Sequence, residues 1–219
     1  MQALDLNGFI YNISIWAIPV LFAITLHEVA HGWMARYFGD RTAELLGRLS
    51  LNPMRHIDPV GTVLVPGVLL LLGLPLFGWA RPVPVASSGM RKPRLALIMV
   101  ALAGPAANIF MALLWCGVLA AVVRLPGGAT VDHWLVLMAQ AGIVINVVLA
   151  LFNLLPIPPL DGGRVLAGVL PKRIGAAFEK MAPVGMFIVL GLSVLGLFGW
   201  LFRPAYRAIG LVIKALGIG

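Results

Sequence analysis

L-F-A-I-T-L-H-E-V-A-H, residues 21–31, ends an apolar run with two histidines and a glutamate. The run carries no Asp, Glu, Lys or Arg from Leu6 to His27, which is long enough for a helix that crosses a bilayer. Because residues four apart lie on one face of an α-helix, His27 and His31 can hold one metal ion with Glu28 beside it. Polar and ionisable side chains inside a membrane helix cost free energy, so these three residues are candidates for function.

The H-E-x-x-H spacing is typical of zinc metalloproteases, in which the two histidines bind zinc and the glutamate acts on a water at the metal. The motif is short and also occurs by chance in helices. The alternative is that neighbouring helices satisfy His27 and His31 while Glu28 faces water. The apolar surroundings favour the metal site, because a membrane helix rarely keeps such groups without a function.

The composition indicates an integral membrane protein, with the lipid bilayer as its first partner. Of the 219 residues, 61% are hydrophobic and 11% are charged, whereas soluble chains have about 45–50% apolar and about 25% charged residues. The net charge of +8 is scattered over short loops, which fits cytoplasmic flanks and lipid headgroups better than nucleic acid. Cys116 is the only cysteine, which excludes a disulfide within the chain and a cysteine-based metal site.

Four further stretches without Asp, Glu, Lys or Arg are long enough to span a bilayer, namely residues 59–80, 95–123, 133–160 and 181–202. We therefore predict an all-α polytopic membrane protein with about four spanning helices, the first running from about Gly8 to about Tyr37. We expect one membrane-embedded domain over residues 1–219. Its core covers roughly residues 8–170, and a C-terminal helix and an interfacial helix follow within residues 181–219.

Residues 59–80 are predicted to form a re-entrant segment, because basic residues flank them on both sides. Arg48 and Arg55 precede the segment, and Arg81 and Arg91 follow it; basic loops favour the cytoplasm. Prolines and glycines within it make a continuous helix poor. We expect an extended return over residues 78–85, short extended pieces within residues 43–61, and the histidine pair toward the cytoplasmic side.

A second motif, N-L-L-P-I-P-P-L-D-G, covers residues 153–162. Its three prolines forbid a regular helix, so the chain can turn back and bring Asp161 toward the core. A catalytic zinc takes three protein ligands, and Asp161 is the candidate for the third, with His56 next. The alternative for Asp161 is an Asp-Gly turn at a helix end.

The two motifs together resemble those of the site-2 protease family of intramembrane zinc metalloproteases. Residues 52–56 (N-P-M-R-H) and 104–108 (G-P-A-A-N) are also similar to family features, and the resemblance covers roughly residues 8–170. The chain has no room for a PDZ or CBS domain. Substrate choice would then depend on the membrane part, on an unidentified regulator or on a prior cut by another protease.

The resemblance implies one Zn²⁺ per chain, bound by His27, His31 and Asp161. A zinc-bound water activated by Glu28 would attack the scissile carbonyl of a membrane-embedded protein or peptide, as in regulated intramembrane proteolysis. The expected location is a bacterial inner (cell) membrane.

Three further residues are substrate-binding candidates. The resemblance places Asn153 beside the substrate backbone, where an amide can donate and accept hydrogen bonds; the alternative is a cap on a broken helix. Asn108 could contact the substrate or form an interhelix hydrogen bond. His56 could stabilise an oxyanion or guard the site, or it could be an ordinary loop histidine.

Two other classes of function compete with the protease. The His/Asp cluster could be the transport site of a metal or ion transporter, but such proteins often carry internal repeats, and none is found. The chain could also be a catalytically inert family member that acts as a membrane scaffold. Glu28 argues against this, because an inert member has no need of the base.

Overall fold

The computed structural model describes residues 6–71, 78–86, 89–124 and 129–215, and these residues contain helices but no β-strand. Within these described residues, three helices are long and apolar enough to cross a membrane, namely α1 (Leu6–Tyr37), α4 (Pro93–Val122) and α5 (Ala129–Asn153). A bent pair, α7 (Lys172–Glu179) and α8 (Ala182–Val194), is a fourth candidate with a 58° angle between its helices. The prediction of an all-α polytopic membrane protein is confirmed.

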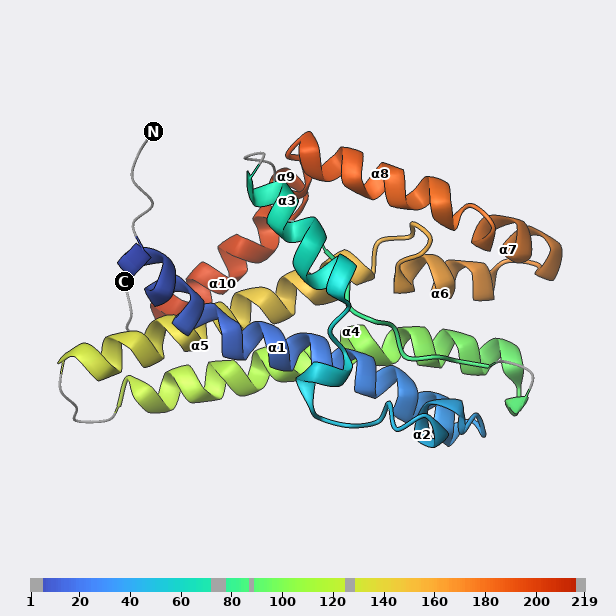
Figure 1. Ribbon diagram of the computed structural model, residues 1–219, viewed down its shortest axis with the longest axis horizontal. Helices are drawn as coiled ribbons and strands as arrows, with labels where there is room; N and C mark the ends of the chain where they lie inside the picture. The colour runs from blue at the N-terminus through green and yellow to red at the C-terminus, as the bar shows by residue number, and fades with distance from the viewer. Residues whose placement is uncertain (1–5, 72–77, 87–88, 125–128, 216–219) are drawn as a thin grey trace.

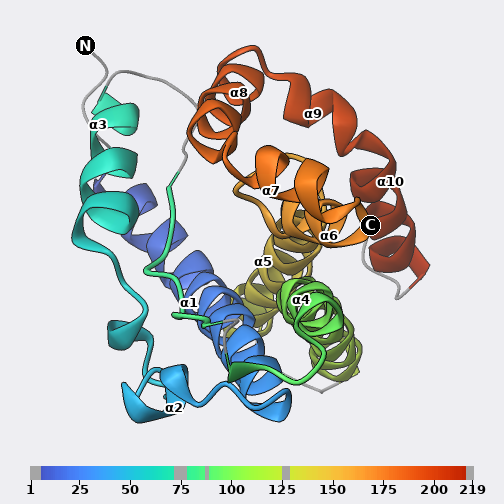
Figure 2. The same ribbon diagram turned by 90° about the vertical axis from the view of Figure 1, so that its right-hand side faces the viewer.

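Helices α1, α4 and α5 pack together as the central bundle (Figures 1 and 2). Alanines are frequent among its buried residues and let the helix backbones approach closely. Helix α1 ends as predicted, because Gly39 follows it with φ +106°, a conformation that favours glycine. The bundle also buries polar side chains, among them Thr25, Asn108 and Asn146, and the functional site is built around this polar centre.

The chain between α1 and α4 begins with short helical pieces. These are α2 (Thr42–Leu45), a 3-10 turn η1 (Pro53–Arg55), a π-helical turn η2 (Pro59–Leu64) and α3 (Val65–Leu71). We expected extended pieces within residues 43–61, and capping explains the difference. The Asn52 side chain accepts a hydrogen bond from Met54 N, and Asp58 accepts from Val60 N and Gly61 N. A proline follows each cap, which favours a helical turn.

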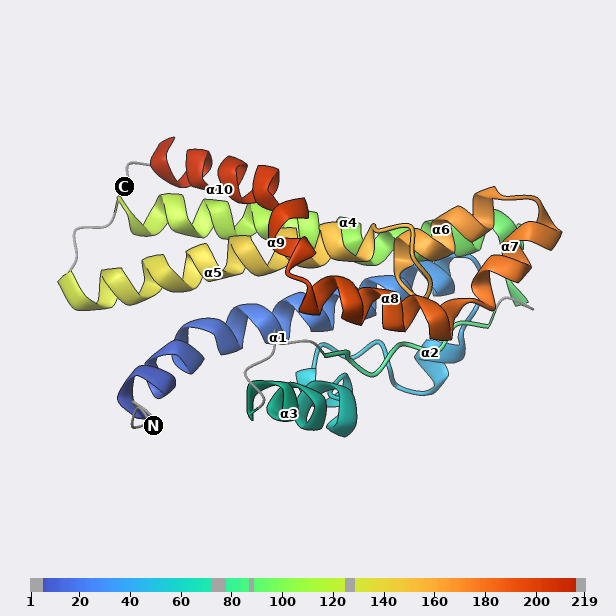
Figure 3. The same cartoon turned by 90° about the horizontal axis from the view of Figure 1, so that it is seen from above.

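Residues 72–77 of the predicted re-entrant segment lie outside the described residues, but both of its ends are described. Trp79 N donates to Gly61 O at 3.1 Å, and Thr62 Oγ1 donates to Trp79 O at 2.9 Å. The chain that leaves at Thr62 has therefore come back to the same place at Trp79. Residues 79–86, called the return segment below, run beside α1, and α3 lies on the opposite side of α1 from α4 (Figures 2 and 3).

We expect the loops that contain Arg48 and Arg91 to lie on the same side of the membrane, because the segment between them returns to its starting point. Single cysteines at the exposed positions Leu46 and Arg91, in a Cys116→Ala background, should react with an impermeant thiol reagent from the same side. Arg124→Cys, just past the other end of α4, should react from the opposite side. Labelling of Leu46→Cys and Arg91→Cys from opposite sides would establish a full span between them.

The chain after α5 folds back over the bundle. It forms α6 (Asp161–Val169), α7, α8, α9 (Leu197–Leu201) and α10 (Arg203–Ala215). The last of the predicted apolar stretches, residues 181–202, is broken at Gly196, which has φ +69°. Helix α10, at the place of the expected interfacial helix, packs Ile209 against Leu119 of α4 and Ile143 of α5.

Candidate metal centre and active site

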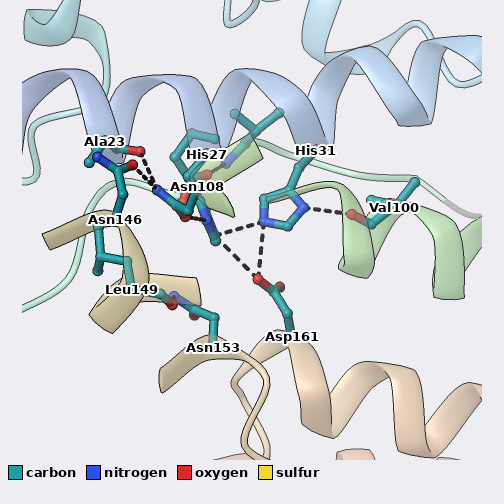
Figure 4. Close-up of polar contacts among 11 residues, drawn as sticks. Ala23, His27, His31, Val100, Asn108, Asn146, Leu149, Asn153 and Asp161 are labelled. Carbon is teal, nitrogen blue, oxygen red and sulfur yellow. Dashed lines mark hydrogen bonds and ion pairs between the residues drawn. The ribbon is translucent and has the colours of Figure 1, made fainter. Parts of the chain in front are cut away.

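Three side chains converge where α1, α4 and α6 meet (Figure 4). His27 and His31 project from one face of α1, and Asp161 is the first residue of α6. The two histidine Nε2 atoms are 3.0 Å apart. Asp161 Oδ2 lies 3.2 Å from His27 Nε2 and 3.3 Å from His31 Nε2. All three residues are buried, with 5–7% of their surface exposed. The structure thus brings together the three residues predicted as a ligand set.

Tight packing after α5 brings Asp161 to this point. The proline-rich residues 154–160 turn back on themselves, and α6 starts against them (Figure 4). A Cβ on Gly162 would lie 2.2 Å from Leu154 O, and one on Gly163 would lie 2.6 Å from Pro158 N. Neither glycine has a positive φ, so the role of both is to allow this close approach.

The donor atoms fit a zinc ion. Ligand atoms about 2.0–2.1 Å from a tetrahedral zinc lie about 3.3 Å from one another, close to the three separations of 3.0–3.3 Å found here. His31 Nδ1 lies 2.7 Å from Val100 O; a carbonyl only accepts, so Nδ1 carries the proton and Nε2 of the neutral ring offers a lone pair. Asp161 Oδ2 is buried with no hydrogen-bond donor among the described residues. A cation between these atoms would satisfy all of them.

Gly104 of α4 makes room for this cluster. A Cβ at this position would lie 2.4 Å from His31 Nε2 and 2.6 Å from His27 Nε2. Those are the two atoms that face Asp161, so a side chain here would occupy the space of a metal ion. Glycine at position 104, the first residue of the 104–108 stretch that resembles a family feature, is therefore explained by steric space.

Gly104→Ala should lower zinc affinity by about three- to tenfold, because α4 can relieve the overlap only by moving away from α1. Gly117→Ala is the matched control, since the same change in the same helix meets no heavy atom within 4 Å. Competition with a zinc chelator measures both affinities in the purified protein. Equal affinities for the two variants would show that a side chain at position 104 fits beside the two histidines without disturbing them.

Glu28 contacts the return segment. Its Oε2 accepts a hydrogen bond from Val83 N at 2.9 Å, and Val83 is buried. The segment is held on both sides of this contact. Arg48 Nη2 donates to Arg81 O at 2.8 Å, and Ala86 N donates to Asp40 Oδ2 at 2.6 Å. The carboxylate next to the first histidine is therefore fixed by a backbone amide, a contact that sequence reasoning missed.

The Asp40 carboxylate remains ionised at neutral pH and keeps its end of the return segment in place. Burial by itself raises the pKa of Asp40, but hydrogen bonds from Thr42 and from Ala86 N bring this pKa below its ordinary value. Because the folded-state pKa is lowered, the stabilisation is present above the unfolded-state pKa and is lost as the pH falls through the folded-state pKa.

The remaining candidates take different positions. Asn108 Oδ1 lies 2.6 Å from His27 Nδ1, so Asn108 contacts a predicted ligand from behind. Asn153 lies at the end of α5, and its Nδ2 donates to Leu149 O in its own helix. His56 is buried in the loop, where Nε2 donates to Ser50 O at 2.8 Å. The structure brings Asp161, and not His56, to the two histidines.

Comparisons with known proteins agree with one another. The family model described as "Peptidase family M50" matches residues 117–195, which include the second motif. A Bacillus subtilis (strain 168) protein named "Putative zinc metalloprotease YwhC" is 38% identical over 193 residues, which cover 87% of this chain and 85% of that protein. "Putative zinc metalloprotease Rip2" of Mycolicibacterium smegmatis is 31% identical over 199 residues, or 90% of this chain and 72% of that protein.

A more distant relative is "Zinc metalloprotease MJ0392" of Methanocaldococcus jannaschii, which is 24% identical over 191 residues, covering 85% of this chain and 44% of that protein. No solved structure matches the chain. The similarity to these three relatives extends over 85–90% of this chain.

Proposed function

Because the chain belongs to peptidase family M50, the site-2 protease family, we propose that it is an intramembrane zinc metalloprotease that cleaves peptide bonds of membrane-embedded substrates. The observation that carries this proposal is the buried cluster of His27, His31 and Asp161 with Glu28 beside it. The substrate is a membrane protein or a membrane-bound peptide.

His27, His31 and Asp161 would hold one zinc ion through Nε2, Nε2 and Oδ2. When bound, zinc acts as a Lewis acid toward the scissile carbonyl and lowers the pKa of a coordinated water to around 7. With only these three residues as protein ligands, the ion would remain accessible to water, as catalytic zinc sites require.

Glu28 is the general base in this mechanism. It takes the proton of the attacking water and later gives a proton to the leaving amine. The Val83 amide holds Oε2, so the carboxylate has a fixed orientation and its second oxygen is left for the proton transfer. Positioning of this kind is one of the main contributions an enzyme makes to a hydrolytic rate.

The substrate must unwind before it is cut, because a helix has no free backbone groups at the scissile bond. Asn153 lies one proline-rich turn before Asp161 (Figure 4), and its amide can pair with the freed groups of the substrate backbone. We assign it this binding role. Asn153→Ala should then slow the appearance of cleavage products while zinc remains bound.

The site lies toward the cytoplasmic side of a bacterial cell membrane in this proposal. His31 is a little over one turn before Arg36 in α1, and the basic residues Arg41, Arg48 and Arg55 follow in the loop. Basic loops favour the cytoplasm. The relatives from Bacillus and Mycolicibacterium support a bacterial setting.

Fragment mapping tests the proposal and does not require that the substrate be identified first. Membrane fractions of cells with the wild-type protein are compared with those of cells that carry Glu28→Gln at the same level, and new peptide termini are identified by mass spectrometry. We expect termini inside or next to membrane spans that appear only with the wild type. Glu179→Gln, a matched change at an exposed carboxylate of α7, should give the wild-type pattern.

Identical termini in all three samples would reject the protease and favour the inert scaffold. Zinc transport is tested separately, by zinc uptake into vesicles that contain the protein. Uptake that depends on His27 but not on Glu28 would favour the transporter.

A further inference from the structure

Two asparagines form a hydrogen-bonded pair at the centre of the bundle. Asn108 of α4 and Asn146 of α5 are both 0% exposed. Asn108 Nδ2 donates to Asn146 Oδ1 at 2.9 Å and to Ala23 O at 3.2 Å, and Asn146 Nδ2 donates to Gly142 O at 2.9 Å (Figure 4). Polar side chains at such a depth are costly and usually functional.

The orientation of each amide follows from the carbonyls at its ends. Gly142 O can only accept, so Asn146 must present Nδ2 to it and Oδ1 to Asn108. Asn108 must then present Nδ2 to that oxygen and to Ala23 O. Its own Oδ1 therefore faces His27 Nδ1 at 2.6 Å, and that nitrogen must carry the proton.

We propose that Asn146 is a positioning residue that acts through Asn108 to hold His27 in the tautomer that binds metal. With the proton on Nδ1, the His27 Nε2 atom offers a lone pair toward His31 Nε2 and Asp161 Oδ2. The inference rests on the zinc site of the proposed function. Asn146 itself lies behind Asn108, and its hydrogen bonds reach neither the substrate nor the three ligands.

The two histidines differ in how firmly their tautomers are set. His31 Nδ1 donates to a backbone carbonyl, Val100 O, which has no other orientation. His27 Nδ1 faces a side-chain amide, which would donate in place of accepting if it turned over. A reversed Asn108 would place the His27 proton on Nε2, where it would block the metal. Ala23 O and Asn146 Oδ1 together oppose that reversal, and only Asn146 can be changed by mutation.

Zinc affinity of the purified protein, measured by competition with a chelator, tests the relay. Asn146→Leu should lower the affinity by about tenfold, which is the lower end of the range for groups that orient metal ligands. Asn153→Leu is the matched control for zinc affinity. It is the same change in the same helix, and each asparagine donates to the carbonyl four residues earlier at 2.9 Å. We expect the control to retain the wild-type affinity within about twofold.

Asn146→Asp separates the acceptor function from packing. A carboxyl group kept protonated by burial can still accept from Asn108 and donate to Gly142 O. We expect this variant to recover at least half of the affinity lost in Asn146→Leu, on a logarithmic scale. Equal affinities for Asn146→Leu and Asn153→Leu would overturn the relay and leave the asparagine pair as a clasp between α4 and α5.

A second measurement reports the tautomer directly and needs no variant of Asn146. In the zinc-free wild type, ¹⁵N-histidine NMR should show His27 protonated on Nδ1, with assignment by single histidine replacements. Protonation on Nε2 would overturn the relay whatever the variants do. If the wild type bound no zinc, the proposed function would fail, and the tautomer measurement would still decide on the relay by itself.

Discussion

Asp161→Asn is expected to lower zinc affinity by at least about tenfold and to abolish cleavage, with the protein still inserted and folded. The change removes the charge of the proposed third ligand and leaves the shape of the side chain nearly unchanged. In the structure, Asp161 Oδ2 lies 3.2–3.3 Å from the two histidine Nε2 atoms and has no hydrogen-bond donor among the described residues. A neutral amide in this position holds a divalent cation weakly.

The fold of the zinc-free protein should tolerate this change. Without metal, a buried carboxylate that faces two lone pairs is unfavourable, whereas an asparagine can turn its Nδ2 toward them. The thermal midpoint of Asp161→Asn in the presence of a chelator should therefore equal or exceed that of the wild type. Glu179→Gln, which removes an exposed carboxylate, should change neither zinc affinity nor cleavage. Normal zinc binding and cleavage by Asp161→Asn would make Asp161 a turn residue and place the third ligand elsewhere.

Glu28→Gln should abolish cleavage, by at least about 100-fold in rate, because general acid–base catalysis contributes about 10²–10⁴-fold. It should also retain about one zinc per chain, because the proposed function makes Glu28 the base and leaves zinc binding to His27, His31 and Asp161. Glutamine keeps an oxygen that can accept from Val83 N, so the contact at 2.9 Å with the return segment can persist. The variant therefore separates proton transfer from metal binding and from local structure.

Metal analysis and fragment mapping of the same preparation check this prediction. His27→Ala is the comparison, because removal of a ligand should lose both zinc and cleavage. Loss of zinc from Glu28→Gln to the same extent as from His27→Ala would make Glu28 a ligand or a residue required for folding.

The features that depend on neighbouring residues could be predicted from the sequence. The first helix was expected from about Gly8 to about Tyr37 and runs from Leu6 to Tyr37, because a charge-free run and Gly39 set its ends. The clustering of Asp161 with His27 and His31 followed from two motifs considered together. Neither motif alone gives the distance between them, since the carboxylate arrives through a turn at the end of a different helix.

Contacts with distant residues that lie outside the two motifs could not be predicted in this way. Asn146 looks like one polar residue in an apolar run, and its partner Asn108 is 38 residues away. Val83 and Glu28 are 55 residues apart, and no local pattern connects them. Gly196 breaks the last apolar stretch, but Gly191 and Gly199 stand close to it in the sequence, so the position of the break was not evident.

The return segment has a consequence for the supply of backbone N–H groups near the site. Pro82 and Pro84 have no backbone N–H group. The other two N–H groups between residues 81 and 84 both donate hydrogen bonds, Arg81 N to His56 O and Val83 N to Glu28 Oε2. This stretch therefore needs no water to satisfy its donors, which suits irregular backbone within a membrane, and it offers no free donor for strand pairing. A peptide that lies alongside this stretch could accept a hydrogen bond from Val83 N only by displacing the Glu28 carboxylate. Binding of a peptide strand at Val83 and release of Glu28 from Val83 N would therefore occur together.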